Sequence, residues 1–448
     1  MNRKQSRRCV AGMLLVATAA YVSAPSTELS AGQAVPKASP MDSAAQDYVK
    51  LVLAAGIHDA DYVDAYYGPP EWKKEADSRK LPLDEIAKQA ADVRGRVTSV
   101  PQPSGEMERL RQVYLDRQLS SLLARVRMLQ GERLSFDEES KALYDAVAPT
   151  HPESHFREIL ALLEKRFAGD GPLGARYEAW RRPFVIPKDK LDAVFQIAIK
   201  AGRERTARHL ALPPNETFTV EYVTNKSWSG YNWYQGQYKS LIQVNTDLPV
   251  YIDRAVDLAC HEGYPGHHVY NALLEKHLVR DRGWVEFSVY PLFSPQSLIA
   301  EGTANFGIEV AFPGNERLAF ERTVLFPAAG LDPARAAEYY EVQALVEKLS
   351  YAGNEAARRY LNGKIDAAAA AQWLEQYALM SPERAKQRVR FFDQYRSYVI
   401  NYNLGKDMVR RHIESLGGTA ANPAKRWQEF GRLLSSPRLP SGLTGAGG

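Results

Sequence analysis

A proline–glycine pair set between histidines constrains this chain more than any other feature. It lies in the segment His261-Glu-Gly-Tyr-Pro-Gly-His-His268. Residues 251–260, which precede it, repeat apolar side chains at the spacing of one buried helix face and therefore predict a helix. A His–Glu pair with a second histidine one turn later is typical of zinc enzymes, in which the glutamate, here Glu262, is the general base. Pro265 occupies the position of that second histidine.

Two histidines remain as candidates for the second metal ligand. In a straight helix, neither His267 nor His268 would complete a tetrahedral site with His261. Pro265 has no N–H group to continue the helix, and Gly266 tolerates a positive φ, so the pair can bulge out of the helix. The remaining residues then read His-Glu-x-x-His. We therefore expect His261 and His267 to bind Zn²⁺, with His268 as the alternate ligand.

A third ligand is expected from a second predicted helix, residues 297–309. Catalytic zinc sites often take a carboxylate from another helix, and Glu301 is the best candidate. Asn305 lies one turn further on, and we expect it to donate a hydrogen bond that orients the Glu301 carboxylate. Gly302 and Gly307 weaken this helix intrinsically, which favours the close approach of another helix.

At these residues the chain resembles the domain of unknown function 885 family. The HExxPGHH and EGxA patterns of that family match residues 261–268 and 301–304, and Thr303 stands where the family usually has Trp. Residues 222–249 and 397–405 also look like family segments. The resemblance implies a mostly helical, zincin-like (gluzincin-type) hydrolase. It also implies that Tyr402 donates a hydrogen bond to the oxyanion that forms during amide hydrolysis.

A small β pair is predicted directly before the metal helix. Residues 217–223 alternate with period two, and residues 239–246 form a second strand after a glycine- and aromatic-rich connection. In zincins a strand at this place lines the cleft and pairs with an extended substrate. We therefore expect Asn245 and Tyr231 to contact substrate. The alternative is a plain hairpin that covers one end of a helical core.

The first 24 residues predict an export signal. A basic segment, residues 2–8, is followed by a short apolar run that ends in Val22-Ser-Ala24. The formal net charge of +4 equals the charge of the four basic residues in that segment, so nothing basic remains to favour nucleic acid. We expect a periplasmic or secreted protein with no membrane span after cleavage. An uncleaved anchor is the alternative.

The rest of the chain is predicted to be a single, mostly α-helical domain, residues 41–434. It comprises an N-terminal helical part, 41–212, and a metal-site part, 213–434. A flexible lead-in is expected over 25–40, and a disordered tail over 435–448. Ser135-Phe-Asp-Glu138 predicts a capping box. Residues 335–360 carry one long apolar stripe.

The sequence therefore predicts an exported zinc metallopeptidase that acts on a peptide or small amide substrate. Two alternatives stay open. The same residues could hydrolyse non-peptide amides or esters, or they could form a metal-binding site without catalysis. A closed site with His268 as a fourth protein ligand would favour the last alternative, because a catalytic zinc keeps one position open. The oligomeric state is not determined by the sequence.

Overall fold

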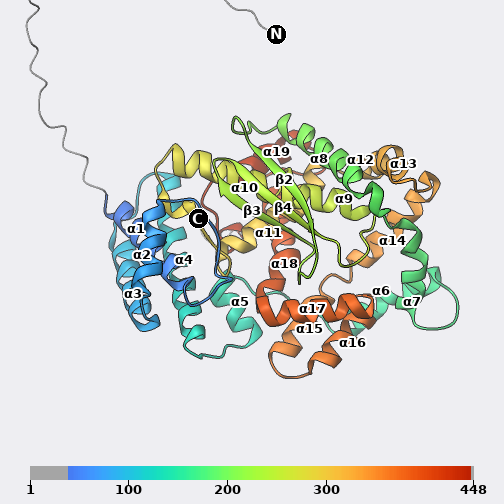
Figure 1. Ribbon diagram of the computed structural model, residues 1–448, viewed down its shortest axis with the longest axis horizontal. Coiled ribbons are helices and arrows are strands. Elements are labelled where there is room, and N and C mark those ends of the chain that lie inside the picture. Colours follow the sequence, from blue (N-terminus) through green and yellow to red (C-terminus); the bar gives the residue numbers. More distant parts are fainter. Residues whose placement is uncertain (1–38, 445–448) are drawn as a thin grey trace, which may run out of the picture. The chain divides into compact units, whose positions relative to one another are not determined.

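The computed structural model describes residues 39–444, which belong to one compact unit that is mostly helical (Figure 1). The mostly α prediction is therefore confirmed. The predicted export signal, residues 1–24, and nearly all of the lead-in lie outside the described residues. Within residues 39–444, no helix combines the length and apolarity needed to cross a membrane.

The N-terminal half is built from helices. These are α1 (Pro40–Ala55), α2 (Pro70–Arg79), α3 (Leu83–Ser99), α4 (Glu106–Leu129), α5 (Phe136–Tyr144), α6 (Glu153–Arg166), α7 (Leu173–Arg181) and α8 (Leu191–Ala207). The predicted capping box begins α5: the Ser135 hydroxyl accepts from the Glu138 N–H, and the Glu138 carboxylate accepts from the Ser135 N–H. Helices α1 to α4 lie together on one side of the molecule (Figure 1).

Three strands form the larger sheet, in the order β2–β4–β3. They are β2 (Thr217–Val223), β3 (Gly230–Gly236) and β4 (Lys239–Asn245). Strand β4 pairs parallel to β2 and antiparallel to β3. The prediction found β2 and β4 but missed β3, which lies in their connection. Two further short strands, β1 (Val63–Tyr66) and β5 (Val289–Pro291), pair with each other.

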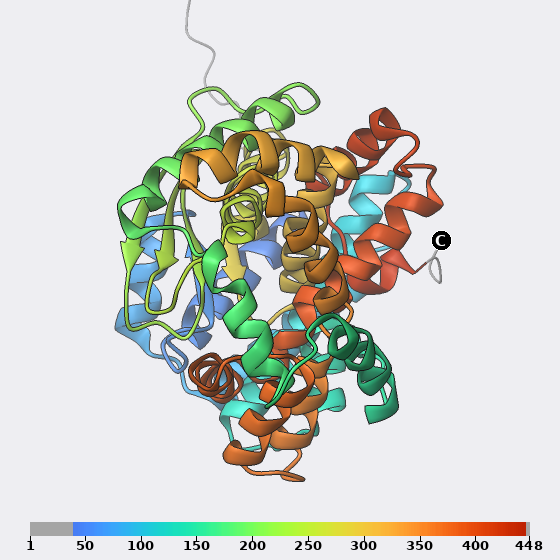
Figure 2. The same ribbon diagram turned by 90° about the vertical axis from the view of Figure 1, so that its right-hand side faces the viewer.

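The metal-site part, predicted over 213–434, begins with the strands β2 to β4 and continues in helices. The first of these are α9 (Asp253–Leu258), a π-helical turn (Ala259–Gly263), α10 (His267–Leu274) and α11 (Pro295–Ala311). They are followed by α12 (Asn315–Phe320), α13 (Phe326–Ala329), α14 (Ala336–Glu347), α15 (Ala352–Leu361), α16 (Ala367–Tyr377), α17 (Pro382–Tyr395), α18 (Ile400–Ser415), α19 (Pro423–Leu434) and α20 (Pro440–Leu443). Seen from the side opposite α1 to α4, the segment with α12 to α14 lies in front of the central helices (Figure 2).

The residues of the predicted apolar stripe lie on α14 and just after it, where Tyr339, Val342 and Leu349 are buried, and the chain turns at 348–351 before α15 begins. One expectation for this part is wrong. The tail is not disordered over 435–444, because Leu439 and Leu443 are buried and residues 440–443 form α20. Residues 445–448 lie outside the described part.

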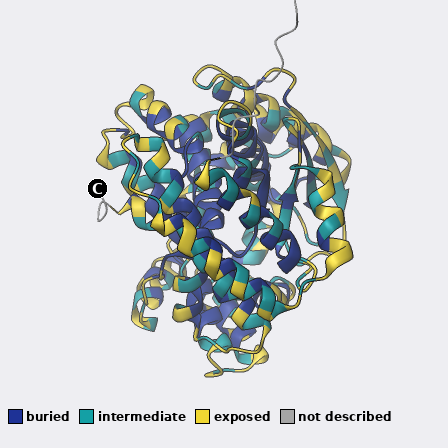
Figure 3. Cartoon of the chain, turned by 90° about the vertical axis from the view of Figure 1, so that its left-hand side faces the viewer, coloured by how far each residue is buried: buried dark blue, intermediate teal, exposed yellow. Residues whose placement is uncertain are grey.

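Helices α11 and α18 cross at the centre of the fold. A Cβ atom added to Gly302 would lie 2.5 Å from the backbone of Gly405, so the two helices touch backbone to backbone. The predicted close approach of another helix is confirmed at Gly302. Gly307 instead makes room for the ring of Pro265, which would lie 3.1 Å from a Cβ atom added at this glycine. Buried residues concentrate in these central helices, and exposed residues lie on the outer helix faces (Figure 3).

Candidate metal centre

The Pro265–Gly266 pair leaves the helix, as predicted, but for a different reason. After the π-helical turn the chain runs extended through Tyr264, and α10 begins at His267. The φ angle of Gly266 is −80°, so no positive φ is required. A Cβ atom there would lie 1.9 Å from the carbonyl oxygen of His261. Glycine is needed because two backbone segments pass so close together.

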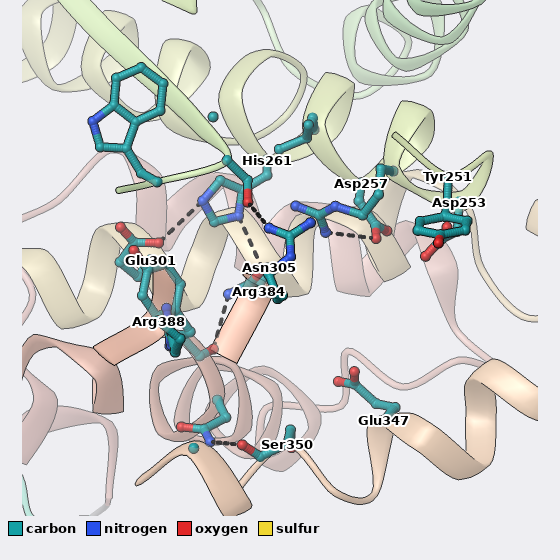
Figure 4. A pocket seen from close by; sticks show the side chains of 18 of the residues that line it. Tyr251, Asp253, Asp257, His261, Glu301, Asn305, Glu347, Ser350, Arg384 and Arg388 are labelled. Atoms are coloured by element: carbon teal, nitrogen blue, oxygen red, sulfur yellow. Dashed lines mark hydrogen bonds and ion pairs between the residues drawn. The ribbon is translucent and has the colours of Figure 1, made fainter. Parts of the chain in front are cut away.

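This excursion brings His267, and not His268, beside His261. The Nε2 atoms of His261 and His267 are 3.1 Å apart. The Glu301 Oε2 atom lies 3.2 Å from Nε2 of His261 (Figure 4). It lies 3.7 Å from Nε2 of His267. Within the described residues, these three form the one group whose arrangement could hold a metal ion.

The three donor atoms fit a tetrahedral cation. Ligand atoms bound about 2.0–2.1 Å from zinc in tetrahedral geometry lie roughly 3.3 Å from each other, close to the separations observed here. The Glu301 Oε2 atom is buried and has no hydrogen-bond partner. A buried carboxylate oxygen without a partner is costly, and a cation between the three side chains would satisfy it.

Asn305 contacts a different ligand from the one expected. Its Nδ2 group donates to the Tyr402 carbonyl (3.0 Å), which leaves Oδ1 facing Nδ1 of His261 at 3.1 Å. That oxygen can only accept, so the proton of His261 lies on Nδ1 and its Nε2 lone pair faces His267 and Glu301. The prediction that Asn305 orients Glu301 is therefore wrong.

The group that orients Glu301 is Tyr398, which the sequence analysis missed. Its hydroxyl donates to the Glu301 Oε1 atom at 2.7 Å. Burial alone would raise the pKa of Glu301, but His267 and His261 outweigh it and hold the pKa well below its usual range. The hydrogen bond from Tyr398 to Oε1 leaves the Oε2 atom facing the two histidines. Tyr398 lies in segment 397–405, which resembles the family, and this resemblance is the sequence feature that could have identified it.

Glu262 points into the same cavity as the three candidate ligands. Burial raises the pKa of its carboxyl to about 7; His267 opposes the shift and Glu301 adds to it. Strand β3 passes directly over this group, since a Cβ atom on Gly230 would lie 2.7 Å from the Glu262 Oε1 atom. The Asn232 amide donates to the Glu262 carbonyl at 2.7 Å and fixes the turn.

Two tyrosines named from the sequence also line the cavity. The Tyr402 ring lies 6.5 Å from the ring of His261, and burial together with the charge of Glu301 raises its pKa well above the ordinary value. Its hydroxyl therefore remains protonated and able to donate. The Tyr231 hydroxyl donates to Asp64, a residue on β1 that the sequence analysis did not single out. Burial raises the pKa of Asp64 to about 6, against the effects of Tyr231 and His267.

Two other predicted site residues lie elsewhere. His268 is buried against Glu216, 3.0 Å from its Oε2 atom, and its other ring nitrogen is 2.9 Å from the Ser240 hydroxyl. It cannot also reach the metal site, so the alternate-ligand prediction is wrong. The Asn245 amide donates to the carbonyls of Lys226 and Trp228 and does not line the cavity. Its role is to hold that loop rather than a substrate.

The strand before the metal helix also differs from the prediction. Strand β4 lies between β2 and β3, so both of its edges are occupied and neither can pair with a substrate. The cavity is lined instead by residues 228–232, at the start of β3. It encloses about 800 Å³ and also receives side chains from α9, α10, α11, α17 and α18. A cavity of this volume accommodates a small organic molecule or a short peptide segment.

A scan against protein-family models gives no match to this sequence, and a search of curated proteins gives none. Among solved structures, the chain is similar to a candidate lipoprotein from Colwellia psychrerythraea, with a TM-score of 0.48 and 15% identity over 90% of this chain and 74% of that one. It is also similar to a candidate lipoprotein of unknown function from Shewanella oneidensis, with a TM-score of 0.39 and 13% identity over 83% of this chain and 75% of that one.

Proposed function

We propose that this protein is an exported, zinc-dependent hydrolase of zincin-like (gluzincin) type that cleaves peptide bonds. The observation that carries the proposal is the convergence of His261, His267 and Glu301 on one point beside the Glu262 carboxyl, in a wall of an 800 Å³ cavity. Three protein ligands and a neighbouring carboxyl are the composition of a catalytic rather than a structural zinc site.

His261, His267 and Glu301 would hold the metal, which when bound supplies a Lewis acid that makes water nucleophilic near neutral pH. Glu262 accepts a proton from the attacking water at its carboxylate and returns it to the leaving nitrogen. The Tyr402 hydroxyl donates to the oxyanion.

Export rests on the predicted signal over residues 1–24, and we propose a periplasmic or secreted location on that basis. The chemistry of the site does not separate peptides from other amides or from esters, because the same residues would act on all of them. A non-catalytic metal site is the less favoured alternative. Within residues 39–444 no fourth protein ligand joins the other three, which leaves a position for a substrate or water.

The test is metal content together with hydrolysis, measured on the mature protein. We expect about one zinc per chain in the wild type. His261→Ala should lose both metal and hydrolysis of a mixed peptide library, whereas Glu262→Gln should keep the metal and lose hydrolysis. His277→Ala, at a partly exposed histidine outside the cavity, serves as the control and should change neither. A Glu262→Gln protein with full activity would exclude the general-base assignment.

A further inference from the structure

Two arginines on α17 face the cavity beside the candidate metal centre. Arg384 and Arg388 are one helical turn apart and both line the cavity (Figure 4). Residues four apart lie on one face of a helix, so the two guanidinium groups form a single basic wall. Both side chains are partly buried.

The other arginines of the cavity are neutralised by carboxylates. Arg181 lies 3.2 Å from Glu178, and Arg254 lies 3.1 Å from Asp257. Arg384 differs, because its guanidinium donates to the neutral Ser229 hydroxyl at 3.0 Å. Burial, with the like charges of Arg254, Arg181 and Arg388, lowers the pKa of Arg384 to about 10. It remains a cation at neutral pH and has no anionic partner among the described side chains that act on it.

Arg388 is likewise held by rings rather than by a counter-ion. Its Cζ atom lies 4.5 Å from the ring centre of Phe391 and 5.6 Å from that of Tyr402. The one described carboxylate whose charge acts on it is that of Glu301. That carboxylate already accepts from Tyr398 and faces the two histidines. Arg388 therefore lies beside Tyr402, and the N–H groups of its guanidinium are free to bind a ligand.

A partly buried cation without a counter-ion destabilises the folded protein. Two such cations in one cavity therefore indicate a role in binding an anionic ligand. Guanidinium groups match carboxylates in geometry and bind them through paired hydrogen bonds. We propose that Arg384 and Arg388 bind a carboxylate group of the substrate and position the bond to be cleaved next to the metal centre. The proposal rests on the hydrolase function proposed above and narrows its substrates to carboxylate-bearing peptides or amides.

Such a carboxylate can come from the C-terminus of a peptide or from an acidic side chain. A C-terminal carboxylate would make the protein a carboxypeptidase, and an acidic side chain would allow internal cleavage. The two sources share the chemistry that the arginines recognise, and substrates that carry only one of them distinguish the two.

The experiment compares three N-acetylated peptide series with the zinc-loaded protein: a free C-terminus, a C-terminal amide, and a C-terminal amide with one Asp or Glu. We expect the best carboxylate-bearing series to be cleaved at least about tenfold more efficiently, by kcat/KM, than the uncharged amide. Arg384→Gln and Arg388→Gln should bring this ratio close to one. Arg390→Gln, at an exposed position on the same helix, should leave it unchanged.

A second readout does not depend on turnover. Calorimetry with an N-acetylated amino acid and with its amide should show carboxylate-dependent binding that Arg384→Gln and Arg388→Gln abolish. Equal binding and cleavage of acids and amides would overturn the proposal while leaving the hydrolase intact. Carboxylate-dependent binding without cleavage of any series would support the arginine site and reject the proposed hydrolase. Circular dichroism of each variant checks that it is folded.

Discussion

Nδ1 of His261 donates a hydrogen bond to the side-chain oxygen of Asn305 at 3.1 Å, and the amino group of the same Asn305 donates to the Tyr402 carbonyl at 3.0 Å. These two bonds determine the amide orientation without ambiguity, because a carbonyl oxygen can only accept. They join the first histidine of the site to the helix that carries Tyr402. One side chain therefore sets both the tautomer of a ligand and its position relative to the tyrosine.

Replacing this amide should weaken metal binding without unfolding the protein. Asn305→Leu removes the acceptor of the His261 Nδ1 proton, and we expect metal affinity to fall by about 10–100-fold. Asn305→Asp keeps an acceptor at the same place and should retain most of the affinity. Competition with a chelator of known affinity measures the effect. Identical affinities for Asn305→Leu and the wild type would show that the contact does not orient the ligand.

Two neighbouring tyrosines should respond differently to loss of the hydroxyl. Tyr398→Phe removes the 2.7 Å hydrogen bond to Glu301 and should weaken metal binding. Tyr402→Phe should leave metal binding unchanged but lower kcat by about 10²–10³-fold, since its hydroxyl is assigned to the transition state. Metal titration and steady-state kinetics on both variants separate the two roles. Equal kinetics for Tyr402→Phe and the wild type would remove it from the mechanism.

The crossing of α11 and α18 should tolerate no side chain. Gly302→Ala places a Cβ atom 2.5 Å from the Gly405 backbone, and we expect a loss of about 3 kcal/mol or more in the free energy of unfolding. Gly353→Ala on α15 is the matched control, because a Cβ there meets no atom within 4 Å. It should be neutral or stabilising by about 0.5–1 kcal/mol. Urea unfolding of both variants makes the comparison.

Acid should weaken the contact that holds His268 away from the metal. Burial alone would raise the pKa of Glu216, but hydrogen bonds from His268, Tyr264 and Arg203 lower it below the ordinary 4.5. A lowered carboxyl pKa stabilises the fold above pH 4.5, and this contribution is lost as pH falls through the folded-state pKa. Glu216→Gln should therefore cost about 3 kcal/mol at pH 7.

The pH dependence of that cost provides the check. The difference in unfolding free energy between the wild type and Glu216→Gln should shrink as pH falls below 4.5 and through the lowered folded-state pKa, below which the folded wild-type carboxyl is also neutral. Urea unfolding at several pH values between about 3 and about 7 follows the change. A difference that grows on acidification would contradict the assigned direction.

Local patterns in the sequence predicted the parts of the site that lie along one helix or one turn. The periodicity before His261, the proline without an N–H group and the carboxylate at Glu301 sufficed to bring three ligands together in the prediction. The close contact that makes Gly266 obligatory involves the backbone of a residue five positions away, and no propensity describes it. Its φ angle was therefore predicted incorrectly.

The remaining errors involve partners that are distant in the chain. Asn305 turned toward His261 because Tyr398, almost a hundred residues further on, already holds Glu301. Strand β3 was missed because Gly230 and aromatic residues made it resemble a loop, yet only glycine fits over the Glu262 carboxyl. The basic wall formed by Arg384 and Arg388 on α17 cannot be distinguished in the sequence from an ordinary charged helix face. Only the tertiary structure shows that, within the described part, the two arginines contact Ser229 and aromatic rings rather than a carboxylate.

The glycine contact between α11 and α18 also bears on how a substrate enters. Since Gly302 and Gly405 meet without side chains between them, Glu301 on α11 and Tyr402 on α18 belong to one rigid body. If the cavity widens to admit a peptide, we expect the opposite wall, formed by residues 228–232 and α17, to move. Entry would then be a movement in which Arg384 and Arg388 approach Glu301 and Tyr402, which stay in place.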